Sequence, residues 1–236
     1  MDDKQYPLSV LSVVSSTDTL LGRPECKRLH IHSKGIGLIR FPMPMSQNEI
    51  PIYDAEGSLA YVATKNKSWS SHSVLSSSQR EPLVAIDYKL GGRPQLRPLT
   101  VASRPEMASI MLQTKCTSRA MTFRPQEGGC TLEWKYTRIP GPDGKAHMNL
   151  CLEKKEEKEG LLYNRQVAHL IRSRETRSPG STRWATGQGG ELILFPEEMT
   201  GVVDEALVVA TCLVMLRAER DQRRLIQAMV IAGAGS

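Results

Sequence analysis

The sequence lacks the short motifs that mark the common catalytic and cofactor sites. It has no G-x-S-x-G nucleophile elbow, no H-E-x-x-H zinc pair and no G-x-x-x-x-G-K-[ST] phosphate loop. The glycines of residues 35–37 lack the third glycine and the following helix of a dinucleotide loop. We therefore predict a protein that is not an enzyme and that holds no cofactor.

The cysteines also form no pattern that would bind a metal or build a disulfide framework. The five cysteines are an odd number, widely spaced, and no C-x-x-C occurs. His30 and His32 fall on one side of an expected strand, but zinc requires three or four ligands. The sequence predicts no metal site and an intracellular protein with reduced thiols.

No apolar run is long enough to cross a membrane. The longest, residues 206–216, would rise about 16 Å as a helix, roughly half of a bilayer core. The first residues are acidic and polar, which is unlike a secretory signal. We expect a cytoplasmic protein without a transmembrane span, either peripheral at a membrane or nuclear.

Positive charge is in excess over the whole sequence. Lys and Arg number 31 against 25 Asp and Glu, which gives a net charge of +6 and favours an anionic partner. Aromatic residues are only 5% of the chain and no nucleic-acid-reading motif is present, so nucleic acid is not the expected partner.

Most of the chain alternates between apolar and polar residues in short runs, which is typical of antiparallel strands. The clearest hairpin joins the alternating strand at Leu132, Trp134 and Tyr136 to a strand over residues 147–153. An earlier hairpin is predicted over residues 49–64, in which Pro51 indicates an edge strand. The mixed charges of residues 153–160 predict a solvated turn. Other strands are predicted over residues 29–32, 36–41, 83–89, 161–171 and 191–195.

One late segment has the opposite character. Residues 202–225 contain no Gly or Pro, and residues 206–216 are apolar or nearly so on every face of a helix predicted over about 202–218. Such a helix must be surrounded. The predicted fold is mainly β, a closed antiparallel barrel of about twelve strands around a buried C-terminal hydrophobic helix. The alternative is a sandwich with the helix across one face.

The late helix and the early hairpin carry a resemblance to a known family. Residues 203–216, VDEALVVATCLVML, look like the late hydrophobic central helix of that family, and residues 50–64 and 83–89 look like its early strands. The chain thereby resembles the tubby C-terminal-like superfamily, which groups the tubby domain, the phospholipid scramblases and the LURP-one-related proteins. The resemblance implies a twelve-stranded barrel around a central helix, which binds membrane phosphoinositides rather than catalysing a reaction.

The same resemblance points to basic residues after the early hairpin as the lipid-headgroup site. The matching positions are Lys65 and Lys67, with Lys89 after the next strand. Side chains two residues apart point to one side of an extended segment, and ammonium groups suit a polyphosphate headgroup. The expected partner is an anionic phospholipid or a peripheral membrane surface.

An alternative basic patch lies in the loop of residues 172–190. It comprises Arg172, Arg174, Arg177 and Arg183, whose guanidinium forks suit phosphate. A solvated loop is the competing interpretation.

The chain is predicted to have an N-terminal extension (residues 1–26), a single barrel domain (27–224) and a C-terminal tail (225–236). The second hypothesis for its function is a protein-interaction or transcription-linked scaffold module without a lipid site. Such a module would bind a protein through the basic helix end, residues 217–224, and the apolar residues 225–231. An exposed tail would favour a binding segment, whereas a packed tail would be structural.

Overall fold

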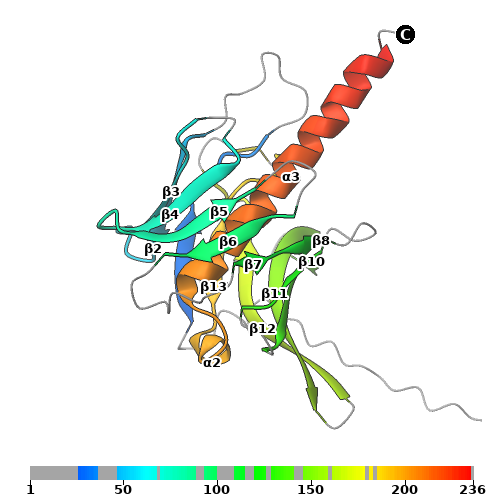
Figure 1. Cartoon of the computed structure of the whole chain (residues 1–236). Helices are drawn as coiled ribbons and strands as arrows, with labels where there is room; N and C mark the ends of the chain where they lie inside the picture. The colour runs from blue at the N-terminus through cyan, green and yellow to red at the C-terminus, as the bar shows by residue number, and fades with distance from the viewer. Residues whose placement is uncertain are drawn as a thin grey trace, which may run out of the picture.

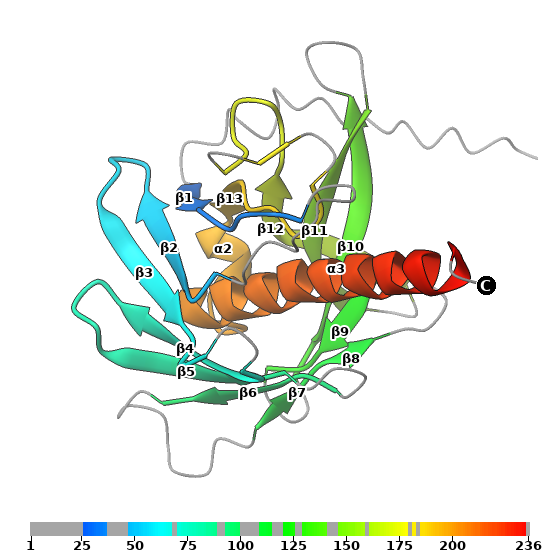
Figure 2. The same cartoon turned by 90° about the horizontal axis from the view of Figure 1, so that it is seen from above.

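A single antiparallel sheet curves around a long C-terminal helix (Figures 1 and 2). The computed structural model describes residues 26–36, 47–67, 70–88, 93–99, 109–114, 120–125, 129–140, 146–158, 161–178, 181–182 and 185–234. The strands in these ranges are β1 (Lys27–Ile31), β2 (Glu49–Asp54), β3 (Leu59–Thr64), β4 (His72–Ser77), β5 (Pro82–Asp87), β6 (Gln95–Pro98), β7 (Ile110–Met111), β8 (Gln113–Thr114), β9 (Met121–Phe123), β10 (Thr131–Pro140), β11 (Ala146–Lys158), β12 (Leu161–Ile171) and β13 (Glu191–Leu194). The helices are α2 (Pro196–Met199) and α3 (Glu205–Ala234).

The thirteen strands form a nearly closed barrel in the order β7-β6-β5-β4-β3-β2-β1-β13-β12-β11-β10-β9-β8. The two edge strands, β7 and β8, are separated in the chain by Leu112 alone. β7 pairs with β6 and β8 pairs with β9, so residues 110–114 join both edges of the sheet. The mainly β barrel with a C-terminal helix is confirmed, with thirteen strands rather than about twelve.

The two predicted hairpins are both present. β2 and β3 flank a turn in which Gly57 has a positive φ and the Asp54 carboxylate accepts a hydrogen bond from the Ser58 amide at 2.7 Å. The second hairpin pairs β10 with β11 along ten residues. Leu132 and Trp134 are fully buried on the inward face of β10, as their alternation predicts.

The prediction of a solvated turn over residues 153–160 is wrong for most of that run. β11 continues to Lys158 and pairs with β12 as far as Leu161. Opposite charges meet across neighbouring strands, with Lys135 at 2.7 Å from Glu153 and Lys155 at 2.6 Å from Glu133. Cross-strand ion pairs therefore allow a strand where the local pattern indicates a turn.

Pro51 does not mark an edge strand, because β2 lies between β1 and β3. The Pro51 carbonyl accepts a hydrogen bond from the His32 amide, just beyond the end of β1. In an antiparallel strand the N and O of one residue face the same neighbour, so the missing N–H of Pro51 faces the point where β1 has ended. The His32 carbonyl, which that N–H would have served, accepts a hydrogen bond from the Gln47 side chain at 3.2 Å instead.

The first half of α3 is buried on every face. Each residue from Leu207 to Leu216 is at most 6% exposed, and most of them belong to the main hydrophobic core. Tyr61 of β3 donates a hydrogen bond to Glu205 at 2.8 Å, and Trp134 of β10 donates one to Thr211 at 3.0 Å. β3 and β10 lie far apart in the sheet order, so the helix is contacted from different sides of the curved sheet.

The helix is longer than predicted. α3 begins at Glu205, where Asp204 caps it by accepting a hydrogen bond from the Leu207 amide at 2.7 Å, and runs to Ala234. Residues 225–234, assigned above to a separate tail, continue the helix, since Leu, Gln, Ala and Met favour a helix and no proline interrupts the segment. Within the described residues, no helix combines the length and the apolar character needed to cross a membrane.

We expect Thr211→Val to reduce the free energy of unfolding by about 1–3 kcal/mol, because the buried indole N–H of Trp134 would lose its acceptor. Denaturant unfolding followed by tryptophan fluorescence measures the change. Thr211→Ser keeps the hydroxyl and is the control. If Thr211→Ser were as destabilising as Thr211→Val, packing of the methyl group would matter more than the hydrogen bond.

Candidate functional site

Three basic side chains meet at a small cavity between α3 and the ends of β2–β5. Lys65 follows β3, and Arg217 and Arg220 come from α3. We call these three residues the cation cluster. The cavity has a volume of about 20 Å³, and its other lining residues are Gln47, Asn48, Ile50, Ala63, Ser73, Ile86, Leu213 and Val214.

Arg217 is held in place by its neighbours but is not fully paired. One of its terminal nitrogens donates to the Ser70 carbonyl at 2.9 Å, and its guanidinium lies 4.7 Å from the centre of the Tyr88 ring. Its Nε is 3.8 Å from the Asp221 carboxylate. The remaining nitrogen, Nη1, is buried and has no hydrogen-bond partner among the described residues. Arg217, which lines the cavity, thus has one buried donor without a partner in the described chain.

Arg220 is the most deeply buried member, at 6% exposure. Its Nη1 donates to the Ser33 hydroxyl at 3.5 Å, a long contact with a neutral group. The stem of Arg220 lies directly against Gly187, where a Cβ would come within 2.1 Å of the Arg220 Cγ. Gly187 also has a positive φ, so glycine is required there by both space and backbone conformation.

Positive charge dominates the electrostatics of the cavity. Burial, and after it the charges of Arg217 and Arg220, lower the pKa of Lys65 to about 8. Burial is also the main cause that lowers the pKa of Arg220, to about 10. Of the four charged groups that act on Lys65 in the described chain, three are arginines and one is a carboxylate, Asp221. Asp221 also lies 3.6 Å from Arg224, so its charge is shared.

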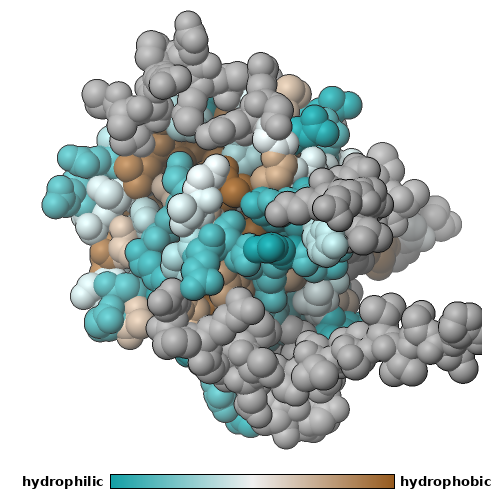
Figure 3. All heavy atoms as spheres, turned by 90° about the horizontal axis from the view of Figure 1, so that it is seen from below, coloured by the Kyte–Doolittle hydropathy of each residue, from teal (hydrophilic) through white to brown (hydrophobic). Residues whose placement is uncertain are grey.

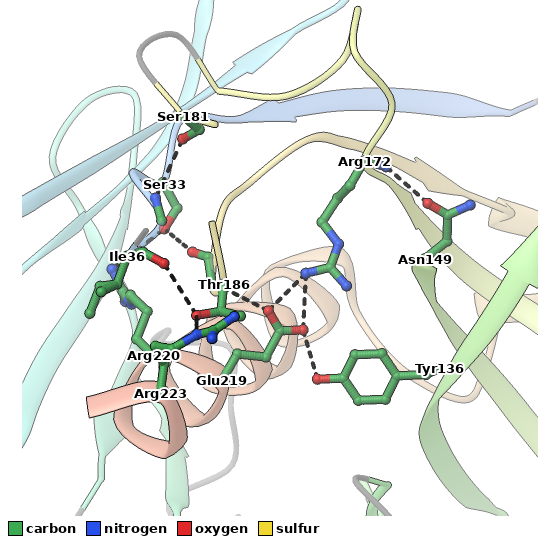
Figure 4. A network of polar contacts seen from close by, with 12 residues as sticks. Ser33, Ile36, Tyr136, Asn149, Arg172, Ser181, Thr186, Glu219, Arg220 and Arg223 are labelled. Carbon is green, nitrogen blue, oxygen red and sulfur yellow. Dashed lines mark hydrogen bonds and ion pairs between the residues drawn. The ribbon is translucent and has the colours of Figure 1, made fainter. Parts of the chain in front are cut away.

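A second polar network, next to the cluster, fixes the helix to the barrel (Figure 4). The Glu219 carboxylate accepts hydrogen bonds from Arg172 at 2.8 and 2.9 Å, from the Tyr136 hydroxyl at 2.7 Å and from the Gly187 amide at 2.7 Å. The Arg172 and Glu219 side chains are both less than one-tenth exposed. This network is electrically balanced, in contrast to the cation cluster.

The structure separates the residues of the predicted lipid site. Lys65 lines the cavity, whereas Lys67 is exposed and its carbonyl accepts a hydrogen bond from the Ser70 amide in a turn. The extended geometry that would align their side chains ends at β3, which stops at Thr64. Lys89 lies outside the described residues.

The alternative basic patch is not a common surface in the described residues. Arg172 is buried in its ion pair with Glu219, and Arg177 donates to the Ser173 carbonyl at 3.4 Å. Arg174 is exposed, and Arg183 lies outside the described residues. The arginines of this loop therefore have different surroundings and different roles.

Sequence reasoning missed Arg217 and Arg220 as partners of Lys65. The available signal was the spacing of Arg217, Arg220 and Arg224, which places three cations on one face of the helix. From the sequence, these arginines were placed only in the basic helix end that would bind a protein partner. A spacing of four would also allow Glu219 to pair with Arg223, but Glu219 binds Arg172 and Arg223 donates to Thr186 at 3.3 Å.

A larger hollow of about 440 Å³ lies at the junction of α2 and α3. Three charged residues that line it have partners, since Lys27 pairs with Glu205 at 2.8 Å and Asp204 caps the helix. Seen from below, hydrophobic and hydrophilic residues of the described chain are mixed on this face of the molecule (Figure 3). The hollow thus offers less to a charged ligand than the cation cluster does.

Metal ligands do not gather in the part of the chain that the structure describes. No group of three or more His, Cys, Asp or Glu there could hold an ion, and Cys26, Cys130, Cys151 and Cys212 are free thiols. His32 stacks at a tilt on Tyr53, with 4.7 Å between ring centres, and has no metal-binding partner besides His30 among these residues.

Comparison with known proteins adds no assignment, since no protein-family profile, curated protein or solved structure matches the chain. The fold and the cluster define the molecule as an antiparallel β-barrel with a long C-terminal helix and a cationic cavity beside that helix.

We expect Glu219→Gln to reduce the free energy of unfolding by about 3 kcal/mol, because it leaves the buried Arg172 without a counter-charge. Arg223→Gln, one helical turn further on, should cost less than about 1 kcal/mol, because among the described residues Arg223 has only a long contact with Thr186. Urea unfolding of both variants checks this. Equal losses would contradict the assignment of Arg172 as the main partner.

Proposed function

We propose that this protein binds a phosphate-bearing anion at a membrane surface, namely a phosphoinositide headgroup, through the cation cluster. The observation that supports the proposal is the excess of buried positive charge at one cavity, where Lys65, Arg217 and Arg220 meet and Asp221 is the principal nearby carboxylate. The resemblance to tubby-like proteins points to the same class of ligand.

Three cations that share one principal carboxylate, Asp221, are unfavourable in the ligand-free protein. The lowered pKa of Lys65 and of Arg220 expresses this cost, because burial and like charges disfavour their protonated forms. A phosphate group would supply the missing negative charge and accept the free hydrogen bond of Arg217 Nη1. The cation cluster therefore favours the binding of an anionic ligand.

The size of the cavity limits how the anion can bind. A volume of about 20 Å³ holds a single water molecule or one oxygen of that size. A phosphate would bind at the mouth with one oxygen directed between Arg217 and Arg220. This geometry suits a headgroup presented at a surface rather than a ligand that must be enclosed.

The proposal is for binding and not for catalysis. Among the described residues that line the cavity there is no carboxylate, histidine or cysteine, and the proposal gives Lys65 the role of a cation that binds the anion. The scaffold hypothesis, without a lipid site, is the alternative that the following experiments would favour if the cluster bound no anion.

We expect Lys65→Met to weaken binding to vesicles that contain phosphatidylinositol bisphosphate by about tenfold or more, because one charge-assisted contact is lost. Sedimentation with vesicles at physiological salt measures it. Lys67→Met removes the same charge from an exposed site outside the cavity and should have a much smaller effect. Equal losses would indicate diffuse charge attraction and would contradict a specific site.

The thermal stability of the same variants separates a binding role from a structural one. Lys65→Met removes a cation whose protonation burial disfavours, so the ligand-free variant should unfold at the same or a higher temperature than the wild type. A clear fall in Tm together with lost binding would mean that Lys65 supports the fold rather than the ligand.

The affinity for a soluble headgroup, inositol trisphosphate, should fall about tenfold between pH 7 and pH 9. Lys65 loses its proton near pH 8 in the free protein, whereas the phosphates stay ionised over this range. Lys65→Arg keeps its charge and should remove most of this pH dependence. Calorimetric titration provides the measurement, and an unchanged pH profile in Lys65→Arg would exclude Lys65 as the titrating group.

Stability should change with pH in the opposite direction. The folded protein releases the Lys65 proton near pH 8 and the unfolded chain near 10.5, so the unfolded state binds more protons in between. The Lys65 contribution to stability therefore rises with pH over that window while affinity falls.

A further inference from the structure

The end of α3 carries a concentration of exposed large apolar side chains. Five of them, between 41% and 60% exposed, fall within seven residues: Leu225, Ile226, Met229, Val230 and Ile231. Figure 1 shows this end of the helix, in red, projecting clear of the sheet. Elsewhere in the described chain, exposed large apolar residues such as Leu99 and Met148 are scattered singly. The helix end is thus an apolar surface that the barrel does not cover.

Four of the five large apolar side chains form one broad stripe. At about 100° per residue, Leu225, Ile226, Met229 and Val230 fall within about 140° of the circumference, and Ile231 lies on the opposite side of the axis. Gln227 is the one polar residue between Leu225 and Ala234. A helix that docks in a groove or on a second helix keeps a charged or polar face toward water, whereas residues 225–234 carry no charge on any face. The absence of a charged face favours hydrocarbon over a protein groove.

Charge changes abruptly along the same helix. Arg217, Arg220, Arg223 and Arg224 lie within eight residues, and no charged residue follows Arg224 in the printed sequence. Arg224 is 39% exposed at its side chain, one residue before the apolar segment begins. Arginines in this position match the negative surface of an anionic bilayer, with the apolar segment directed into it. The charge pattern therefore identifies an anionic lipid surface as the complementary partner.

The dimensions agree with this arrangement. Residues 225–234 rise about 15 Å, which equals half of a hydrocarbon core of about 30 Å. Arg220 precedes Leu225 by five residues, or about 7.5 Å, which corresponds to the depth of one headgroup layer. With the helix upright, the cation cluster would lie at the level of the headgroups.

We propose that residues 225–234 insert into one leaflet of an anionic membrane, with Arg223 and Arg224 at its surface. The proposal of insertion depends on the exposed helix end alone. The placement of a phosphoinositide headgroup at the cation cluster rests on the proposed function. The two contacts contribute differently to membrane binding. The helix end contributes burial of apolar surface, and the cation cluster contributes selectivity for the headgroup.

The insertion is tested on the full chain with vesicles of four parts phosphatidylcholine to one part phosphatidylserine. We expect Met229→Glu to lower partition into these vesicles by about tenfold or more, because a charge would enter the hydrocarbon. Met148→Glu makes the same change at an exposed methionine of β11 and should leave partition within about twofold of the wild type. Equal partition of Met229→Glu and Met148→Glu would overturn the proposal.

Depth is measured separately with Met229→Trp and vesicles whose lipids carry bromine at mid-chain. Bromine should quench the emission that this substitution adds, while the emission of the buried Trp134 is unchanged. Absence of quenching at saturating lipid would overturn insertion. A wild-type dimer that Met229→Glu converts to a monomer would overturn it as well, in favour of a second copy of the chain.

The two proposals fail in different ways. If Met229→Glu abolishes binding to all vesicles, and Lys65→Met abolishes only the preference for phosphatidylinositol bisphosphate, both proposals are supported. An effect of Lys65→Met without an effect of Met229→Glu overturns insertion and leaves the headgroup site standing. An effect of Met229→Glu alone supports insertion and removes the headgroup site.

Discussion

The architecture depends on the burial of a helix that is apolar on every face. Residues 207–216 of α3 have no side that tolerates water, so sheet must face the helix in more than one direction. A sheet that curves round a helix brings its own edges together. Residues 110–114 join those edges by pairing first with β6 and then with β9. The nearly closed barrel is thus a consequence of the helix as much as of the strands.

The same helix determines where charge gathers. Its buried apolar part ends at Leu216, and arginines follow at the point where α3 leaves the core. Glu219 is neutralised by Arg172 in a balanced, buried pair that fixes the helix to β12 and β10. Arg217 and Arg220 line the same cavity as Lys65, and Asp221 is the carboxylate that acts on all three. The two neighbouring sets of charges therefore differ in balance, since Arg172 has its own carboxylate partner whereas three cations share Asp221.

The sequence predicted those parts of the fold that local patterns control. Alternation at Leu132 and Trp134 and the turn at Gly57 reveal their hairpins, and the uniform apolar character of residues 206–216 reveals the buried helix. Features that depend on partners distant in the chain were not predicted. The charged run of β11 indicated a turn because the residues that pair with it lie on a neighbouring strand. Lys65 was recognised, but Arg217 is some 150 residues away in the chain, and only the fold shows that they share a cavity.

The pairing of the first strand with the last has a consequence for how the chain folds during synthesis. β1 pairs with β13, so Lys27 lies opposite Leu194, and α3 follows later still. Strands made early by the ribosome therefore wait for residues 191–216 before their apolar faces can be covered. Contacts of such long sequence separation form slowly and leave partly folded chains prone to aggregation. Completion of this barrel is a late event, governed by the emergence of its helix.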